Sequence, residues 1–140
     1  MIFNSQFTIE NINSMSEGCM IEHLGIEIIE IGENFLKGTM PVDSRTIQPF
    51  GLLHGGASVV LAETLGSIAS NGVVDPSKYA VVGLEINANH IKSAKSGLVT
   101  GLAKPIHLGK RTHVWEISIK NDHEDLVCIS RFTAAIIDKK

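Results

Sequence analysis

The spacing of apolar residues along this chain of 140 residues predicts one long helix and about six strands. From Gly55 onward apolar residues recur at helical intervals, which predicts a helix over about 55–71 that ends in an Asn71-Gly72 C-cap. Shorter helical segments are predicted at 8–16, with Thr8 as a cap, and at 19–24. Runs that are rich in β-branched residues or that alternate apolar and polar positions predict strands at 26–31, 35–40, 79–87, 96–104, 112–120 and 126–137.

The two sides of the long helix differ in the size of their residues. At about 100° per residue, the side of Glu63 carries mostly small residues, namely Gly56, Val59, Val60, Gly66, Ser67 and Ser70. The opposite side carries a bulkier stripe that we expect to pack on the sheet, namely Ala57, Leu61, Leu65 and Ile68. A carboxylate in so apolar a helix costs free energy unless it is paired or partly hydrated. Glu63 is therefore a candidate catalytic residue, and the alternative is an exposed glutamate at the edge of an oligomer.

Helix and strands are largely segregated along the chain, which predicts an α+β protein with an antiparallel sheet on the long helix. No repeat, linker or low-complexity tract divides the sequence, so residues 1–140 are predicted to form a single domain. The architecture of matching size is an antiparallel sheet that wraps around one long central helix. Because a single helix covers only one face of a sheet, the remaining apolar residues favour a homodimer or a dimer of dimers.

The composition is that of an ordinary soluble protein, with 44% hydrophobic and 19% charged residues. No apolar run reaches membrane-spanning length, and Met1 to Gln6 lack the basic start and apolar core of a signal peptide, so we expect a cytoplasmic protein with no membrane partner. Cys19 and Cys128 match no metal or redox spacing and are expected to be buried free thiols. We therefore expect no metal site and no resident cofactor.

Basic residues cluster in segment 86–115, although the whole protein has a net charge of −3. The segment contains no Asp or Glu, and its basic residues are Lys92, Lys95, Lys104, Lys110 and Arg111. A basic stretch in an acidic protein indicates a local site for a polyanion, and the alternative is chance clustering on a solvated strand. No aromatic residue lies between Ile86 and Val114, which argues against nucleic-acid binding through base stacking.

The loop before the long helix reads Gln48-Pro49-Phe50-Gly51-Leu52-Leu53-His54-Gly55-Gly56. A helix that begins at Gly55 or Gly56 leaves its first N–H groups unpaired, and its dipole places partial positive charge there. Glycine also lets another group approach the backbone closely. These features suit an oxygen atom that develops negative charge, and the alternative is a plain helix start with glycine as a tolerated cap.

This loop and Glu63 together resemble a known family. Gln-Pro-x-Gly-x-x-His-Gly-Gly at 48–56, followed after six residues by Glu63, resembles the hotdog-fold acyl-CoA thioesterases of the phenylacetate-degradation type. Their relatives include the 4-hydroxybenzoyl-CoA and 1,4-dihydroxy-2-naphthoyl-CoA thioesterases and the enterobactin-synthesis proofreading thioesterase. Segments 23–26, 40–43 and 107–110 also look like that family, so the resemblance covers nearly the whole chain. It implies hydrolysis of acyl-CoA, or of aryl or acyl carrier thioesters, at the subunit interfaces of a homodimer or homotetramer.

The resemblance also implies roles for five residues. Glu63 is expected to act as a general base on water or as a nucleophile that forms an acyl-enzyme anhydride. The Gly55 N–H is expected to polarise the thioester carbonyl. Gln48 and His54 are expected to orient the carbonyl or the water, and Ser67 to hold the hydrolytic water. We expect the Glu63 carboxylate to be buried beside the Gly55 amide.

The same resemblance assigns the basic segment to the CoA part of the substrate. The expected contacts are Gly83, His90, Ile91, Lys92, Ser93, His107, Leu108, Gly109, Lys110, Arg111 and Thr112. Lys92, Lys110 and Arg111 would meet the phosphates. Members of the family often carry His-Arg-Pro where this chain has Ile91-Lys92-Ser93, so a point charge stands in place of a bidentate guanidinium.

Two other functions remain as alternatives. The first is a non-catalytic hotdog module that binds acyl-CoA, against which the expected register of Glu63 argues. The second is a hotdog dehydratase or hydratase, which uses an Asp/His pair in a motif context that this sequence lacks. The acyl group is left open, as is the choice between the water and anhydride routes.

Overall fold

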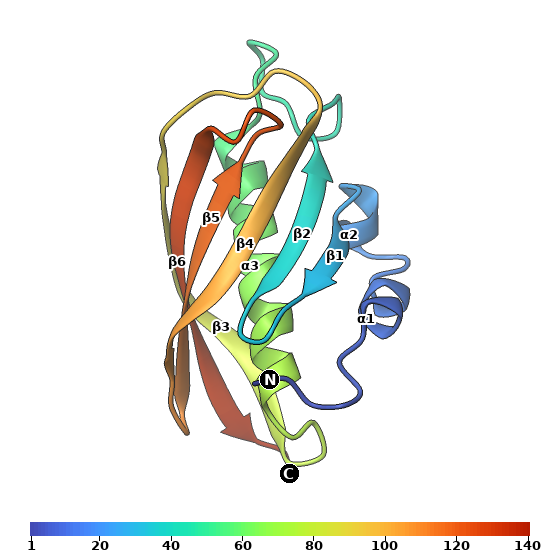
Figure 1. Cartoon of the computed structure of the whole chain (residues 1–140), viewed down its shortest axis with the longest axis vertical. Coiled ribbons are helices and arrows are strands. Elements are labelled where there is room, and N and C mark those ends of the chain that lie inside the picture. Colours follow the sequence, from blue (N-terminus) through green and yellow to red (C-terminus); the bar gives the residue numbers. More distant parts are fainter.

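The structure is a computed structural model that describes residues 1–140. Its helices are α1 (Ile9–Met15), α2 (Met20–His23) and α3 (Gly55–Val73), and its strands are β1 (Glu27–Ile31), β2 (Leu36–Pro41), β3 (Tyr79–His90), β4 (Leu98–Leu108), β5 (Thr112–Lys120) and β6 (Leu126–Asp138). The strands form one antiparallel sheet in the order β1-β2-β4-β5-β6-β3, which wraps around α3 (Figure 1). The predicted α+β hotdog architecture is confirmed. None of the helices is both long and apolar enough to cross a lipid bilayer.

The side of α3 that faces the sheet is wider than the helical pattern predicted. Leu61 and Leu65 are completely buried, as expected. Gly66 and Ser70, which we expected on the side of Glu63, are buried as well. A Cβ atom at Gly66 would lie 2.4 Å from the ring of Phe132, and the indole N–H of Trp115 donates a hydrogen bond of 2.6 Å to the Ser70 hydroxyl. The sheet curves far enough around α3 to cover these small residues too.

The end of α3 differs from the expected Asn71-Gly72 cap. The helix continues to Val73, and its C-cap is Val74 in an extended conformation. Gly72 is a buried helical residue, and a Cβ atom there would lie 2.6 Å from the ring of Phe7. Glycine is therefore needed at this position for close packing of the N-terminal segment, and not for a left-handed turn.

Strands β3 and β4 are longer than the sequence predicted. β3 continues to His90, because His90 still pairs with Cys128 of β6. β4 passes through a bulge after Pro105 and continues to Leu108, which pairs with His113 of β5. Several expected contacts for CoA therefore lie at the ends of strands, where the sheet holds their backbone.

The two edges of the sheet differ in whether another part of the chain covers them. At the β1 edge, the side-chain amide of Asn13 accepts a hydrogen bond from the Ile28 N–H and donates one to the Ile28 carbonyl. At the other edge, the long strand β3 pairs with β6 on one side and has no strand on its outer side, where Val82 and Leu84 are exposed. An uncovered apolar edge of this length is a surface on which another strand can pair.

Candidate functional site

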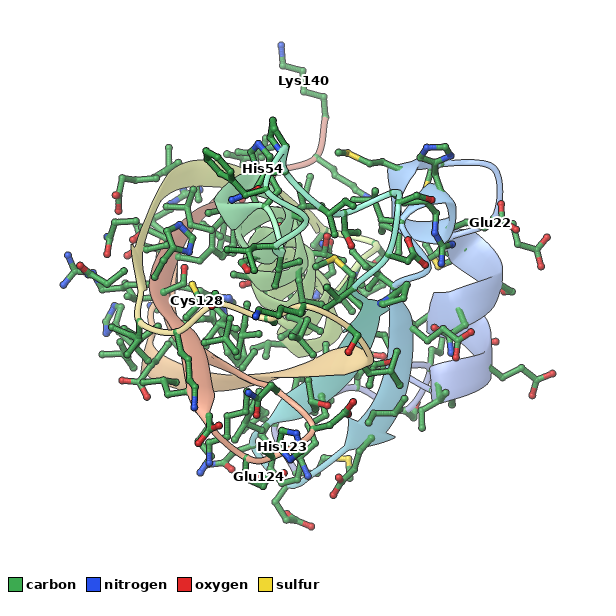
Figure 2. All side chains as sticks on the ribbon, turned by 90° about the horizontal axis from the view of Figure 1, so that it is seen from above. Glu22, His54, His123, Glu124, Cys128 and Lys140 are labelled. Carbon is green, nitrogen blue, oxygen red and sulfur yellow. The ribbon has the colours of Figure 1, made fainter.

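The loop between β2 and α3 ends in a tight cap at His54. The His54 backbone is extended, with φ −67° and ψ 130°, and its Nδ1 atom accepts a hydrogen bond of 2.8 Å from the Gly56 N–H. The His54 N–H in turn donates to the Thr46 carbonyl at 2.8 Å. Figure 2 looks along α3 and shows His54 at the near end of the helix, with the sheet curving around it. The cap fixes the direction in which the first helical amides point.

The N–H of Gly55 has no acceptor within the chain, whereas the neighbouring Gly56 N–H is taken by His54. The imidazole of His90 lies against Gly55, because a Cβ atom at Gly55 would be 2.8 Å from His90 Nε2. An unpaired amide at the start of a helix also benefits from the partial positive charge of the helix dipole. Gly55 therefore offers a free, electropositive donor to a ligand.

A hollow of about 330 Å³ next to this amide brings several of the expected residues together. Its lining includes Gln48, Gly55, His90, Ile91, Lys92 and Ser93. The Gln48 side-chain oxygen accepts a hydrogen bond from the N–H of Phe50, so the side chain is held within its own loop. Lys92 forms an ion pair of 2.7 Å with Asp125, which lowers the pKa of the Asp125 carboxyl. Lys92 therefore reaches a ligand here only by sharing or leaving that pair.

Glu63 lies two turns further along α3, about 12 Å from Gly55 along the helix axis. Its carboxylate lies over β3, where a Cβ atom at Gly83 would be 2.8 Å from Glu63 Oε1. In the single chain Glu63 is exposed, so the expected burial beside the Gly55 amide is not found. The physical reason is that β3 is the last strand of the sheet and nothing in the chain lies beyond it. Ser67, one turn later, is half-buried.

Another four of the expected contacts lie at the opposite end of α3. A hollow of about 520 Å³ there is lined by Leu108, Gly109, Lys110 and Arg111 together with residues that include Val73, Tyr79 and Asp138. Arg111 forms an exposed ion pair of 2.9 Å with Asp138, and Lys110 has no ion-pair partner. Since the 19 residues of α3 span about 28 Å, the two groups of expected CoA contacts are far apart within one chain.

His113 also lines the second hollow, and we did not single it out from the sequence. The residue is only 3% exposed, and its side-chain Nδ1 has no hydrogen-bond partner. Burial lowers the pKa of the His113 imidazole, the nearby His107 lowers it further, and the Gly109 backbone opposes both effects. The sequence could have predicted this burial, because the alternation of β5 places His113 on the same face as Trp115.

The chemistry of the remaining titratable groups adds little to this site. Cys128 is buried, and burial raises the pKa of its thiol. Cys19 is exposed, contrary to our expectation, because it caps the short helix α2 at the surface. No group of three or more His, Cys, Asp or Glu side chains is arranged to hold a metal ion. The arrangement instead offers a free backbone amide, a lone carboxylate and two groups of basic residues.

Comparisons with known proteins match this chain to thioesterases and a CoA thioester hydrolase. The family model for the thioesterase superfamily matches residues 50–128, a range that includes Gly55, Glu63 and the basic segment. A 1,4-dihydroxy-2-naphthoyl-CoA hydrolase from Escherichia coli is 53% identical over 137 residues, covering 98% of this chain and 100% of that protein. A proofreading thioesterase from Cronobacter turicensis is 46% identical and covers 98% of this chain and 99% of that protein.

Solved structures are similar over the whole chain. A mutant thioesterase from Pseudomonas aeruginosa superposes with a TM-score of 0.98 at 47% identity, covering 99% of this chain and 100% of that chain. A thioesterase from Haemophilus influenzae superposes with a TM-score of 0.95 at 48% identity, covering 99% of this chain and 96% of that chain. The lengths and arrangement of the elements are therefore shared with these proteins.

The buried His113 predicts a pH dependence of stability. Its pKa is lowered from 6.5 in the folded chain, so below that pH the unfolded chain binds more protons and the free energy of unfolding falls as the pH falls. His113→Leu should therefore flatten the decrease in urea midpoint between about pH 7.5 and pH 5.5. Val114→Ala on the other face of β5 provides the control, since it changes no titratable group and should leave the slope unchanged. An unchanged slope in His113→Leu would contradict this assignment.

Proposed function

This chain belongs to the thioesterase superfamily and is a thioester hydrolase, and we propose that it hydrolyses acyl-CoA thioesters with Glu63 of one chain and the Gly55 amide of a second. The observation that carries the proposal is the unpaired N–H of Gly55 at the start of the helix that bears Glu63. Carrier-bound aryl or acyl thioesters present the same bond and are included in the substrate class. The products are the free acid and the thiol.

Hydrolysis of a thioester makes three demands on the protein. An oxygen nucleophile must be aimed at the carbonyl carbon, the oxyanion must be stabilised, and the CoA portion must be held. The Gly55 amide meets the second demand, and one such donor is worth about 2.7–4 kcal/mol in the transition state. Glu63 meets the first demand as a general base on water or as the nucleophile itself. Gln48, His54 and Ser67 orient the carbonyl or the water.

The distance between Gly55 and Glu63 argues for a site shared by two chains. About 12 Å of helix separates them, whereas reacting groups must meet at about 3–3.5 Å. Pairing of the exposed β3 edges around a two-fold axis would run the strands antiparallel. Gly83, next to Glu63, lies on the Tyr79 side of the middle of β3, and His90 covers Gly55 at the other end. The axis thus carries Gly55 of one chain toward Glu63 of the other.

The same pairing reunites the two groups of CoA contacts. The hollow that holds Lys92 lies at the His90 end of β3, and the hollow that holds Lys110 and Arg111 lies at the Tyr79 end. Antiparallel edges place the His90 end of one chain beside the Tyr79 end of the other. Positive charge from both chains then converges on the phosphates of one CoA molecule.

The assembly that follows is a homodimer, or a dimer of dimers in a homotetramer, with its active sites at the β3 interface. CoA enters as part of the substrate, and no resident cofactor or metal is required. We place the enzyme in the cytoplasm. Apolar side chains exposed away from the β3 edge, such as Leu98 and Ile106 on β4, support a second interface between dimers.

Glu63→Gln should lower kcat for acyl-CoA hydrolysis by about 10²–10⁴-fold with little change in KM, because it removes the base or nucleophile and keeps the shape of the side chain. Release of free thiol measures the rate on several acyl-CoAs. Glu17→Gln is a matched control, because Glu17 is an exposed glutamate in the turn between α1 and α2. A Glu63→Gln enzyme that keeps most of its kcat would show that Glu63 does not carry the chemistry.

Mixing two inactive variants tests the shared site. Gly55→Pro removes the amide proton at the first helical position, where the backbone suits proline, and the extended His54 suits a residue before proline. Its Cβ atom would displace the exposed His90 ring, so Gly55→Ala, which adds the same Cβ atom but keeps the amide proton, is the control. Each variant alone should be inactive, whereas refolding Gly55→Pro with Glu63→Gln in equal amounts should restore about one quarter of wild-type activity, since half the dimers are mixed and each has one intact site. No recovery, with mixed dimers present, would place both groups of each site in one chain.

Lys110→Ala and Arg111→Ala should each raise KM for acyl-CoA by about tenfold, equivalent to about 1.4 kcal/mol of lost binding, because each removes a phosphate contact. KM for a short pantetheine thioester, which lacks the nucleotide phosphates, should not change. Lys104→Ala serves as the control, because Lys104 belongs to the same basic segment but lines neither hollow. Equal effects on both substrates would remove this loop from the CoA site.

A further inference from the structure

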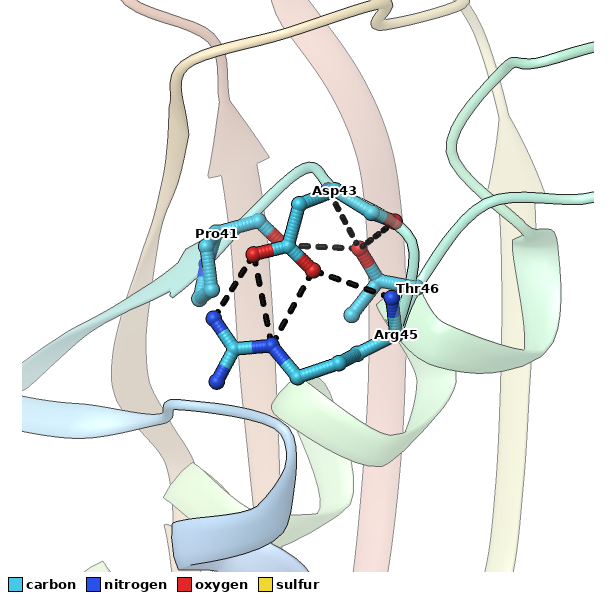
Figure 3. Close-up of polar contacts among 4 residues, drawn as sticks. All are labelled: Pro41, Asp43, Arg45 and Thr46. Atoms are coloured by element: carbon cyan, nitrogen blue, oxygen red, sulfur yellow. Dashed lines mark hydrogen bonds and ion pairs between the residues drawn. The ribbon is translucent and has the colours of Figure 1, made fainter.

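Thr46 stands out in the loop between β2 and α3 because it is a polar residue that is only 2% exposed. Its hydroxyl donates a hydrogen bond of 2.7 Å to the carbonyl of Pro41, the last residue of β2. The same oxygen accepts a hydrogen bond of 3.1 Å from the Asp43 N–H (Figure 3). The side chain therefore ties the start of the loop to the end of a sheet strand.

The backbone of Thr46 connects this tie to the start of α3. The Thr46 carbonyl accepts the His54 N–H at 2.8 Å, and His54 accepts the Gly56 N–H through Nδ1. Gly55 lies between these two anchored residues, so its free N–H can point only where they allow. A short chain of hydrogen bonds thus runs from the sheet through Thr46 and His54 to the amides at the helix start.

We propose that Thr46 is a positioning residue of the active site, whose hydroxyl holds the loop backbone so that the Gly55 amide is aimed at the substrate carbonyl. The inference rests on the proposed function, because it assigns a role to what supports the Gly55 amide. Thr46 does not touch the substrate. It acts through the His54 backbone, and small displacements of a catalytic donor are costly, since a shift of about 1 Å costs about 10²-fold in rate.

The neighbouring pair of Asp43 and Arg45 provides a contrast within the same turn. The Arg45 guanidinium and backbone N–H bind the Asp43 carboxylate, with an ion pair of 2.7 Å, and lower the pKa of Asp43 to about 2. In Figure 3 this pair lies beside Thr46, but the Asp43 carboxylate bonds only to Arg45. Asp43→Asn therefore perturbs the same turn without breaking the path to Gly55.

The end of the loop nearest α3 is held by contacts that do not involve the Thr46 hydroxyl. The Leu53 N–H donates to the Ala94 carbonyl at 2.8 Å, and Ile47 forms a bridge with Leu53. These contacts should keep the loop in place when the Thr46 hydroxyl is lost. The Thr46 carbonyl, and with it the His54 N–H that it accepts, would then be free to shift. Thr46→Val has nearly the same shape and removes the hydroxyl, whereas Thr46→Ser keeps the hydroxyl and removes the methyl group.

We expect Thr46→Val to lower kcat for acyl-CoA hydrolysis about tenfold at unchanged KM, well below its melting temperature, and Thr46→Ser to stay within about twofold of wild type. Asp43→Asn should leave kcat unchanged. In spectra of uniformly 15N-labelled protein, the Gly55 amide resonance should move in Thr46→Val and stay in place in Asp43→Asn. If Thr46→Val does not fold, Thr46→Cys takes its place, because a thiol is a weaker hydrogen-bond donor.

The two readouts separate failure of this inference from failure of the proposed function. A loss of kcat without movement of the Gly55 resonance, or an equal loss in Thr46→Val and Thr46→Ser, would overturn the positioning role and leave the proposed function intact. Movement of the Gly55 resonance at full kcat would instead show that this amide does not limit catalysis, which would overturn its place in the proposed function. A change in melting temperature alone, with kcat and the resonance both unchanged, would reduce Thr46 to a structural residue.

Discussion

The burial of one side of α3 in the curve of the sheet determines where the functional groups lie. Leu61 and Leu65 are completely enclosed, and the ring of Phe132 fits over Gly66 so closely that no side chain could stand there. These contacts set the rotation of the helix about its own axis. With that rotation set, the side chain of Glu63 faces the β3 edge, and the first amides of the helix emerge beside His90. Apolar packing some distance away therefore positions the two groups that we propose as catalytic.

Most elements were predictable from the sequence because their signals are local. Thr8 caps α1 by accepting the Asn11 N–H, as its position before a short helix suggested. The longer course of β3 and β4 was not predictable, because His90 and Leu108 are kept in strands by partners that are distant in sequence. Gly72 was misread as a helix end for a similar reason, since its purpose is a contact with Phe7 far away in the chain.

The same difference between local and long-range signals applies to the candidate site. The motif around Gly55 and the spacing to Glu63 are contiguous, so the sequence predicted these residues and the register between them. The order of strands in the sheet is not a local property, and it places the contacts near Lys92 and those near Lys110 at opposite ends of α3. Thr46 escaped notice because its importance lies in hydrogen bonds to backbone groups, which any polar residue can make. Only the folded chain shows that these bonds lead to the helix start.

The Asn13 side chain closes the β1 edge with a pair of hydrogen bonds to a single residue of that strand, Ile28. A sheet with two open edges can add copies at both, and such growth has no natural end. With one edge sealed, the sheet can be extended only through β3, and a second copy that pairs there uses up the one remaining edge of each partner. In the proposed dimer, growth by strand addition would therefore terminate at a closed pair.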